Sequence, residues 1–346
     1  MTRSIRAVLR AAHTVAIASL LLASATAQAA QTAPLRIHGA TTVLEMGPML
    51  RAAELTPAGA ALVRDGNIAN LWKDDVAPGA PPPPSAQGER YGALTAPVFL
   101  GRADVAGNAE TQALRNSVAH PDLRIILTVT EGLYRVVARR SSGIAAARDL
   151  KGKRIATMPS TSAAYFLHRV LASAGLTEAD VTILPLLATP GADALIAGEV
   201  DALAIWEPEV ERAHAALGGN AVELKGDGAY REIYSLNTTS AALADPIKRG
   251  QIVAYVRALM TACAEGRSNP ARTHALLAKT TGYDIRTIAA AWPHHRFPCA
   301  LPSDLLDVMA EEEQWVAATD RRPARSREAL APLIDASVLA EARGSK

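Results

Sequence analysis

The segment 149-DLKGKRIATMPSTSAAYFLHRVLASAGL-176 combines a turn, a strand and a helix in direct succession. Gly152 lies in the predicted turn, residues 154–157 form an apolar run typical of a strand, and the apolar spacing that follows predicts a helix ending at Gly175. Between the strand and the helix stand Pro159 and a cluster of hydroxyl residues, Ser160, Thr161 and Ser162. This order is typical of α/β proteins, in which groups at the carboxyl end of a strand can reach a ligand.

The same alternation of strands and helices extends to both sides of this segment. Strands are predicted at 35–40 and in 102–112, where the strand ends in a polar loop. Two further apolar runs lie in 123–140, interrupted by Thr128–Gly132, and the chain becomes almost wholly helical from Ala241 to its end. Strands that alternate with helices predict parallel sheets joined by crossover helices.

The chain is long enough, at 346 residues and 49% hydrophobic, to form two lobes. Residues 1–29 are basic, then apolar, and end in Ala27-Gln28-Ala29, which predicts a cleaved signal peptide because the apolar part is too short to span a bilayer. We therefore expect an exported, periplasmic protein. Removal of this segment changes the net charge from +2 to about −1, which favours neither nucleic acid nor a membrane surface as a partner.

The two cysteines and a proline-rich segment give two further predictions. An oxidising compartment favours a disulfide between Cys263 and Cys299, with two separate buried thiols as the alternative. Residues 77–92, APGAPPPPSAQGERYG, contain consecutive prolines that exclude a helix or a central strand and predict an exposed loop. A Pro-rich partner-binding segment is the alternative for this loop.

The sequence contains no phosphate-binding loop, dinucleotide fingerprint, zinc-protease helix or nucleophile elbow. His294 and His295 are adjacent, so on a helix they would point about 100° apart and make a poor metal pair. The acidic run Glu311–Glu313 predicts a solvated helix face. Because a nucleophile and base set is missing, we expect a binding protein rather than an enzyme.

Four segments resemble the nitrate/sulfonate/taurine class of periplasmic substrate-binding proteins of ABC importers, and the related thiamine-precursor binding proteins share this pattern. They are ADVAGNAETQ (103–112), the segment 149–176, DALIAGEVDALAIWEPEVERA (193–213), and NPARTHALLAKTTGYD (269–284) with AAW (290–292). The resemblance implies an α/β chain with the type II periplasmic-binding-protein fold and a ligand cleft between two lobes. Lobe 1 would comprise 34–133 and a helical return, 237–346, and lobe 2 would comprise 134–236.

The same resemblance implies a function. The protein would be an extracytoplasmic solute receptor of an ABC transporter that binds a small organic anion or zwitterion, sulfonate-like or taurine-like, between hinged lobes. It would work as a monomer without a cofactor or metal and deliver the solute to a membrane permease and its ATPase. The alternatives are a thiamine-precursor (pyrimidine) binding protein or a related pyrimidine-synthase-like enzyme, and a periplasmic ligand sensor. A neighbouring permease gene would favour transport, and a sensor kinase gene would favour signalling.

The strongest site prediction is the hydroxyl cluster. A helix N-terminus presents unpaired N–H groups and about half a positive charge, and adjacent hydroxyls add donors, so Ser160, Thr161 and Ser162 suit a sulfonate or carboxylate. Capping of the helix would explain one of these hydroxyls. Trp206 follows a strand and precedes Pro208, and its indole could pack on the apolar part of a ligand. Packing between the lobes is the alternative for Trp206.

Acidic residues at predicted strand ends restrict the class of ligand that we expect. Glu110, Glu131 and Glu207 would repel a pure anion but could accept hydrogen bonds from a zwitterion or an amino-bearing heterocycle. Surface exposure or helix capping is the alternative for each glutamate. Polar residues of the same loops complete the candidate set: Asn108, Thr111, Thr41 and Thr130.

Overall fold

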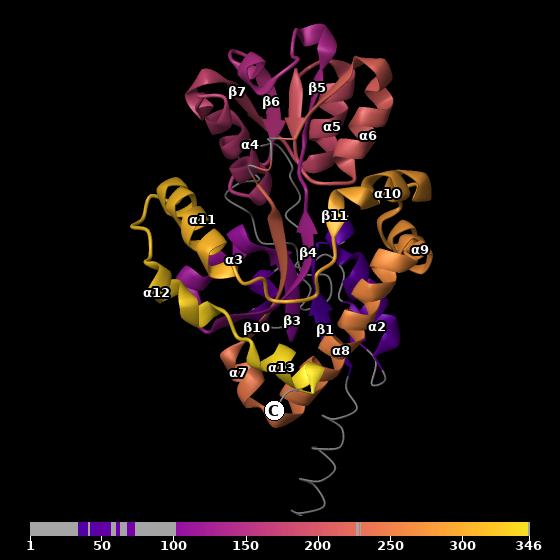
Figure 1. The fold of residues 1–346 in the computed structure, drawn as a ribbon, viewed down its shortest axis with the longest axis vertical. Coiled ribbons are helices and arrows are strands. Elements are labelled where there is room, and N and C mark those ends of the chain that lie inside the picture. The colour runs from indigo at the N-terminus through magenta and orange to yellow at the C-terminus, as the bar shows by residue number, and fades with distance from the viewer. Residues whose placement is uncertain are drawn as a thin grey trace, which may run out of the picture.

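The computed structural model describes residues 34–40, 42–56, 60–62, 68–72, 102–225, 228 and 230–344. The predicted signal peptide (1–29), the Pro-rich loop (77–92) and Thr41 lie outside the described residues. The described chain forms two β-sheets, each flanked by helices (Figure 1). The α/β class predicted from the sequence is therefore confirmed.

The first sheet has six strands in the order β11-β4-β10-β3-β1-β2. Its strands are β1 (Leu35–His38), β2 (Ala60–Leu62), β3 (Val105–Ala109), β4 (Leu123–Gly132), β10 (Glu232–Thr239) and β11 (His295–Arg296). β1 is parallel to β2 and β3, whereas β10 runs antiparallel to β3 and β4. Consequently the carboxyl ends of β1, β3 and β4 and the amino end of β10 meet at one edge of this sheet.

The second sheet has five strands in the order β7-β6-β8-β5-β9. Its strands are β5 (Val136–Arg139), β6 (Arg154–Thr157), β7 (Thr182–Pro185), β8 (Ala202–Ala204) and β9 (Ala221–Leu224). β6 is parallel to β7 and β8, and β5 is antiparallel to β8 and β9. The chain passes from the first sheet to the second between β4 and β5, and it returns between β9 and β10.

Twelve α-helices of the described residues cover the two sheets. They are α2 (Gly47–Leu55), α3 (Glu110–Ala119), α4 (Ser162–Ser173), α5 (Ala188–Ala197), α6 (Glu209–Leu217), α7 (Ser240–Ala244), α8 (Pro246–Ser268), α9 (Ala271–Thr281), α10 (Ile285–Ala291), α11 (Leu305–Thr319), α12 (Arg327–Leu330) and α13 (Ser337–Arg343). In Figure 1, α4, α5 and α6 surround the second sheet, while α2, α8 and α9 lie on one side of the first sheet and α3, α11 and α12 on the other. None of these helices combines the length and the apolar character needed to cross a membrane.

Local sequence signals set several of these boundaries. Asp245 caps α8 through its Oδ1 atom, which accepts hydrogen bonds from the backbone N–H groups of Ile247 and Lys248, and Pro246 occupies the first helical position. α5 ends at Gly198, whose φ of 82° is in the left-handed region that glycine adopts readily. Such signals act within a few residues, so they are legible in the sequence.

Three predicted boundaries differ from the structure. Residues Thr128–Gly132 do not interrupt a strand, because β10 pairs with β4 along its whole length. The polar residues after Ala109 begin α3 instead of forming a loop. β10 starts at Glu232, so the chain rejoins the first sheet before the predicted boundary at 237.

The sequence predicts a solvated helix face for the acidic run Glu311–Glu313 on α11, and this prediction is wrong for two of the three residues. Glu311 is exposed, but Glu312 and Glu313 are buried, because α11 packs against α3. Burial and the nearby carboxylate of Glu110 raise the pKa of Glu312 well above its ordinary value. Glu313 instead binds two arginines of the following segment, Arg322 and Arg325.

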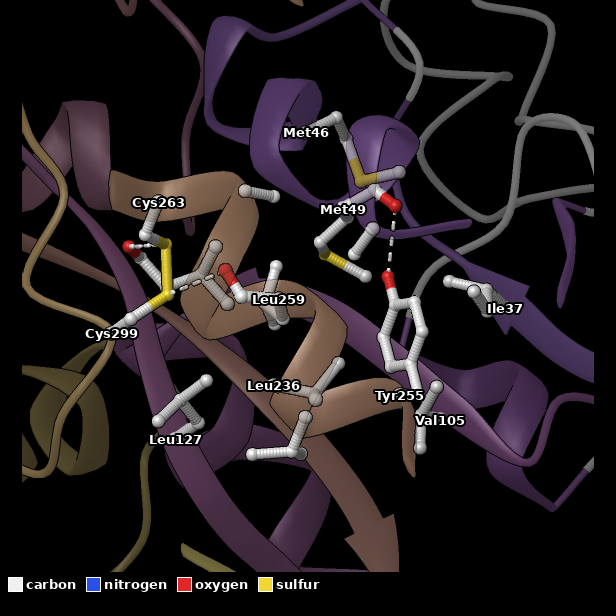
Figure 2. Close-up of a cluster of buried hydrophobic side chains, with 14 of the residues drawn as sticks. Ile37, Met46, Met49, Val105, Leu127, Leu236, Tyr255, Leu259, Cys263 and Cys299 are labelled. Carbon is white, nitrogen blue, oxygen red and sulfur yellow. Dashed lines mark hydrogen bonds between the residues drawn. A yellow bond between two sulfur atoms is a disulfide. The ribbon is translucent and has the colours of Figure 1, made fainter. Parts of the chain in front are cut away.

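The first sheet and α8 enclose a large apolar core (Figure 2). Tyr255 of α8 donates a hydrogen bond of 3.0 Å to the carbonyl oxygen of Met49 in α2. Cys263 of α8 and Cys299, which follows β11, form a disulfide whose Cα atoms lie 6.2 Å apart. Both cysteines are buried, so the bond ties the segment after β11 to the helix through the core.

Candidate functional site

The hydroxyl cluster lies where the carboxyl end of β6 leads into α4. Thr161 occupies the N-cap position, but its hydroxyl donates a 2.6 Å hydrogen bond back to the carbonyl oxygen of Met158. Ser162 Oγ lies 3.1 Å from the hydroxyl of Tyr134. No side chain of the described residues accepts a hydrogen bond at the N-cap, so capping does not account for this cluster. The N–H groups of the first turn therefore have no side-chain acceptor there, and they retain the affinity for an anion that a helix start has.

Ser160 lies at the contact between the two sheets. Its carbonyl oxygen accepts a 2.9 Å hydrogen bond from Nε2 of Gln112, which belongs to α3 beside the first sheet. Ser160 has a φ of 61°, a backbone conformation that is uncommon for a residue other than glycine. The loop between β6 and α4 is thus held from the other half of the molecule.

Trp206 follows β8, whose carboxyl end lies at the same edge of the second sheet as that of β6. The side chain packs against the apolar clusters of both sheets. Its indole nitrogen Nε1 is buried and has no hydrogen-bond partner among the described residues. Trp206 therefore packs between the two sheets, which is the alternative that the sequence allows, and its indole N–H is an unused donor among the described residues.

Two of the predicted acidic ligands already have protein partners. Glu207 Oε1 accepts a 2.9 Å hydrogen bond from Nε of Arg135, and Oε2 accepts one of 2.9 Å from the backbone N–H of Glu211. Burial raises the pKa of Glu207, although Arg135 opposes this shift. Glu110 accepts hydrogen bonds from the hydroxyl of Tyr230 and, at 2.8 Å, from the backbone N–H of Ile233. The bond from Glu211, in the first turn of α6, is the helix-capping alternative that the sequence left open for Glu207, whereas the partners Arg135 and Tyr230 come from distant parts of the chain.

Thr130 and Glu131 point to opposite faces of β4, as successive residues of a strand do. Thr130 donates a 3.3 Å hydrogen bond to the carbonyl oxygen of Glu45. Glu131 lies on the other face, where its carboxylate is 3.4 Å from Arg231 and 4.0 Å from Arg296. Of the two, Thr130 lies on the face of the sheet that contacts the short 3-10 helix Leu44–Met46.

The other polar candidates lie around β3 and the start of α3. Asn108 Oδ1 accepts a 2.9 Å hydrogen bond from the backbone N–H of Ala109, so this side chain stabilises its own turn. Thr111 is fully buried, and its hydroxyl has no partner among the described residues. Thr41 lies outside the described residues.

The structure adds residues that the sequence reasoning missed. Glu45, in the short 3-10 helix Leu44–Met46, is 1% exposed, Glu232 at the start of β10 is 2% exposed, and Tyr234 is 3% exposed. Both carboxylate oxygens of Glu45, Oε2 of Glu232 and the hydroxyl of Tyr234 lack hydrogen-bond partners among the described residues. The sequence feature that could have identified Glu45 is an acidic residue flanked by two apolar residues, Leu44 and Met46. The predicted boundaries of lobe 2, 134–236, include Glu232 and Tyr234, so the sequence does not predict that they lie near Glu45.

A groove of about 500 Å³ lies elsewhere, between α4 and α11. Arg169 of α4 and Glu311 of α11 form an ion pair beside it, and Trp315 packs in the same place against apolar residues of both halves. None of the predicted site residues lines this groove. It therefore does not change the assignment of the candidate site to the edges of the two sheets.

Comparison with known proteins relates the chain to solute-binding proteins. A family model described as NMT1/THI5 like matches residues 86–273. An aliphatic sulfonates-binding protein of Escherichia coli (strain K12) is 34% identical over 187 residues, which are 52% of this chain and 55% of the relative. The match thus spans about half the length of that relative.

Solved structures share the fold. The periplasmic aliphatic sulphonate binding protein SsuA from Escherichia coli has a TM-score of 0.63 at 19% identity, covering 86% of this chain and 91% of the other. The desulfurization enzyme DSZB has a TM-score of 0.56 at 15% identity, covering 90% and 99%. These likenesses confirm the predicted type II periplasmic-binding-protein fold. At such identities they show the fold alone.

Proposed function

Because this chain belongs to the NMT1/THI5-like family, we propose that it is an extracytoplasmic solute receptor of an ABC importer, binding a small organic solute between two lobes. One observation carries the proposal: polar groups of both halves that have no hydrogen-bond partner among the described residues lie where the two sheets meet. The uncapped start of α4 and the indole N–H of Trp206 come from one half, and Glu45 and Tyr234 come from the other. The sulfonate-binding relative supports the same function.

In this proposal, each sheet is the core of one lobe. Lobe 1 holds the six-stranded sheet, built from residues 34–133 and the return from Glu232, and lobe 2 holds the five-stranded sheet. The two crossings, between β4 and β5 and between β9 and β10, act as the hinge. Closure forms contacts such as Gln112 to Ser160, and the solute's contacts with both lobes favour the closed state.

The start of α4 is the proposed site for the anionic part of the solute. Its N–H groups and the helix dipole favour negative charge, and Ser160 precedes the helix in the same loop. The solute is accordingly an organic anion or a zwitterion, of the sulfonate or taurine type. The closed, monomeric receptor then delivers it in the periplasm to a membrane permease driven by an ATPase.

The shared fold with a desulfurization enzyme raises the question of catalysis. In this chain both cysteine sulfurs are joined to each other, so neither is available as a nucleophile. We propose that the solute leaves the protein chemically unchanged. Mass spectrometry of the solute before and after incubation with the protein tests this statement, and any conversion would contradict it.

The receptor function is tested by identifying the solute. Native mass spectrometry of the protein purified from its own periplasm should reveal a bound small molecule. In parallel, thermal melting is followed with sulfonates, taurine, aromatic carboxylates and aminopyrimidines, because a ligand that binds only the folded state raises the melting temperature. A protein that carries no solute and responds to no member of the panel would refute the proposal.

A further inference from the structure

A pair of buried carboxylates at the edge of the first sheet, Glu45 and Glu232, has a single ion-pair partner among the described residues, the imidazole of His295 beside Glu45. Glu45 and Glu232 are 1% and 2% exposed. Neither oxygen of Glu45 and only one oxygen of Glu232 has a hydrogen-bond partner among the described residues. Two buried carboxylates beside a single imidazole leave negative charge unmatched, which is unfavourable, so this arrangement needs an explanation.

Strand register brings these groups to one place. Glu232 pairs with Gly132 and Tyr234 pairs with Thr130, so all four lie on the same face of the sheet. Thr130 in turn donates to the backbone of Glu45. A methyl group built on Gly132 would lie 2.9 Å from Oε2 of Glu232, so glycine leaves the carboxylate room at this position.

The local electrostatics are acidic. Burial, followed by the negative charges of Glu45 and Glu110, raises the pKa of Glu232 well above its ordinary value. Burial, followed by the negative charges of Glu45 and Glu232, also raises the pKa of the Tyr234 hydroxyl. His295 forms an ion pair with Glu45, its Nε2 lying 3.5 Å from Oε1, and, against the effect of burial, Glu45 raises the pKa of this imidazole. Since His295 is shared with Glu207, it offsets only part of this negative charge.

A carboxylate with a purely structural role looks different in the same protein. Glu313 is also fully buried, yet Arg322 and Arg325 both donate hydrogen bonds to its oxygens. No arginine of the described part of the chain pairs with Glu45 or Glu232 in this way. Tyr234 adds a buried hydroxyl that has no hydrogen-bond partner among the described residues. Two carboxylates that can accept hydrogen bonds, and one hydroxyl that can donate or accept, therefore belong to the same group.

We propose that Glu45, Glu232 and Tyr234 form a subsite for a cationic group of the solute, such as a protonated amine or an amidinium. This inference rests on the proposed receptor function and specifies the solute class. An ammonium donates three hydrogen bonds, which the orphaned carboxylate oxygens and the hydroxyl can accept. The receptor therefore selects solutes that carry a positive charge over simple anions such as nitrate or an alkanesulfonate.

The side chain of Tyr134 lies between the cationic subsite and the start of α4. Tyr134 links the two, because its hydroxyl lies 3.1 Å from Ser162 Oγ, while its ring lies beside Glu232 at Gly132. A zwitterion can thus place its anionic end at the helix and its cationic end between Glu45 and Glu232. Net neutrality of the solute then matches a site that has a helix dipole at one end and carboxylates at the other.

Matched solute pairs test this subsite. Each pair differs only in an amine replaced by a hydroxyl: taurine with isethionate, β-alanine with hydroxypropionate, and aminomethylbenzoate with hydroxymethylbenzoate. Thermal melting and calorimetry are run on the full-length mature protein, on Glu45→Gln and on Glu232→Gln. The control is Glu131→Gln, which removes a buried carboxylate from the opposite face of the same sheet.

We expect an amine-bearing member to bind and its hydroxyl partner to bind at least tenfold more weakly. Each of Glu45→Gln and Glu232→Gln should weaken the amine by about tenfold to a hundredfold, and Glu131→Gln should not. Binding of simple sulfonates that is insensitive to the two variants would overturn this inference and leave the receptor function standing. A lack of response to every solute would overturn both. Circular dichroism of each variant establishes that it is folded.

Discussion

Replacement of Glu313 by glutamine should destabilise the protein strongly. Glu311, two residues earlier on α11, is exposed, and its replacement should have little effect. Glu313 is fully buried. Its Oε1 accepts hydrogen bonds of 2.5 Å from Arg322 and 3.0 Å from Arg325, and its Oε2 accepts one of 3.0 Å from each. A glutamine cannot supply the charge that both guanidinium groups need, so they would remain partly buried and unpaired.

The pKa of Glu313 gives the magnitude. Burial alone would raise it, but the hydrogen bonds from Arg322 and Arg325 outweigh burial and lower the pKa from 4.5 to about 2. At about 1.4 kcal/mol per pKa unit, the carboxylate contributes about 3 kcal/mol to folding. Because the pKa is lower in the folded state, this stabilisation is present in full above the unfolded pKa of 4.5 and is lost as the pH falls through about 2.

Urea unfolding of the wild type, Glu313→Gln and Glu311→Gln measures this effect. Near pH 7, Glu313→Gln should lose about 3 kcal/mol, whereas the exposed control should change by about 0.5 kcal/mol or less. Near pH 3 the loss should shrink to about half or less, because the unfolded chain then binds the proton that the folded chain excludes. Equal losses for the two variants, or a loss for Glu313→Gln that does not depend on pH, would refute the reasoning.

Three further predictions follow from the contacts between and within the halves. Replacing Cys263 and Cys299 together by serine should lower the free energy of unfolding by about 3 to 4 kcal/mol, because the bond closes a loop with a sequence separation of 36; an unchanged denaturation midpoint would contradict this. Gln112→Ala removes the hydrogen bond to Ser160, so small-angle scattering of the solute-free protein should give a larger radius of gyration, and identical curves would count against closure through this contact. Trp206→Ala should weaken solute binding by at least tenfold while circular dichroism stays unchanged, and unaltered affinity in calorimetry would remove this indole from the site.

Much of the fold was predictable because its signals are local. The turn at Gly152, the strand that ends at Thr157 and the helix that follows depend on neighbours within a few residues, and the structure contains β6 and α4 at these positions. The position of the hydroxyl cluster between them follows from the same local order. The extent of β4 was not predictable, because its polar residues are held in a strand by pairing with β10, which lies about a hundred residues further along the chain.

By itself the sequence determined the α/β class, the order of the elements and the placement of polar groups at strand ends, since periodicity and turn chemistry are properties of neighbouring residues. Only the tertiary structure decided which of the carboxylates are already satisfied. Glu207 is bound to Arg135 across a separation of 72 residues and Glu110 to Tyr230 across 120, whereas Glu45 and Glu232 have only the imidazole of His295 as a cation among the described residues. The electrostatics of a buried acid depend on partners that folding brings from distant parts of the chain, and no local pattern encodes them.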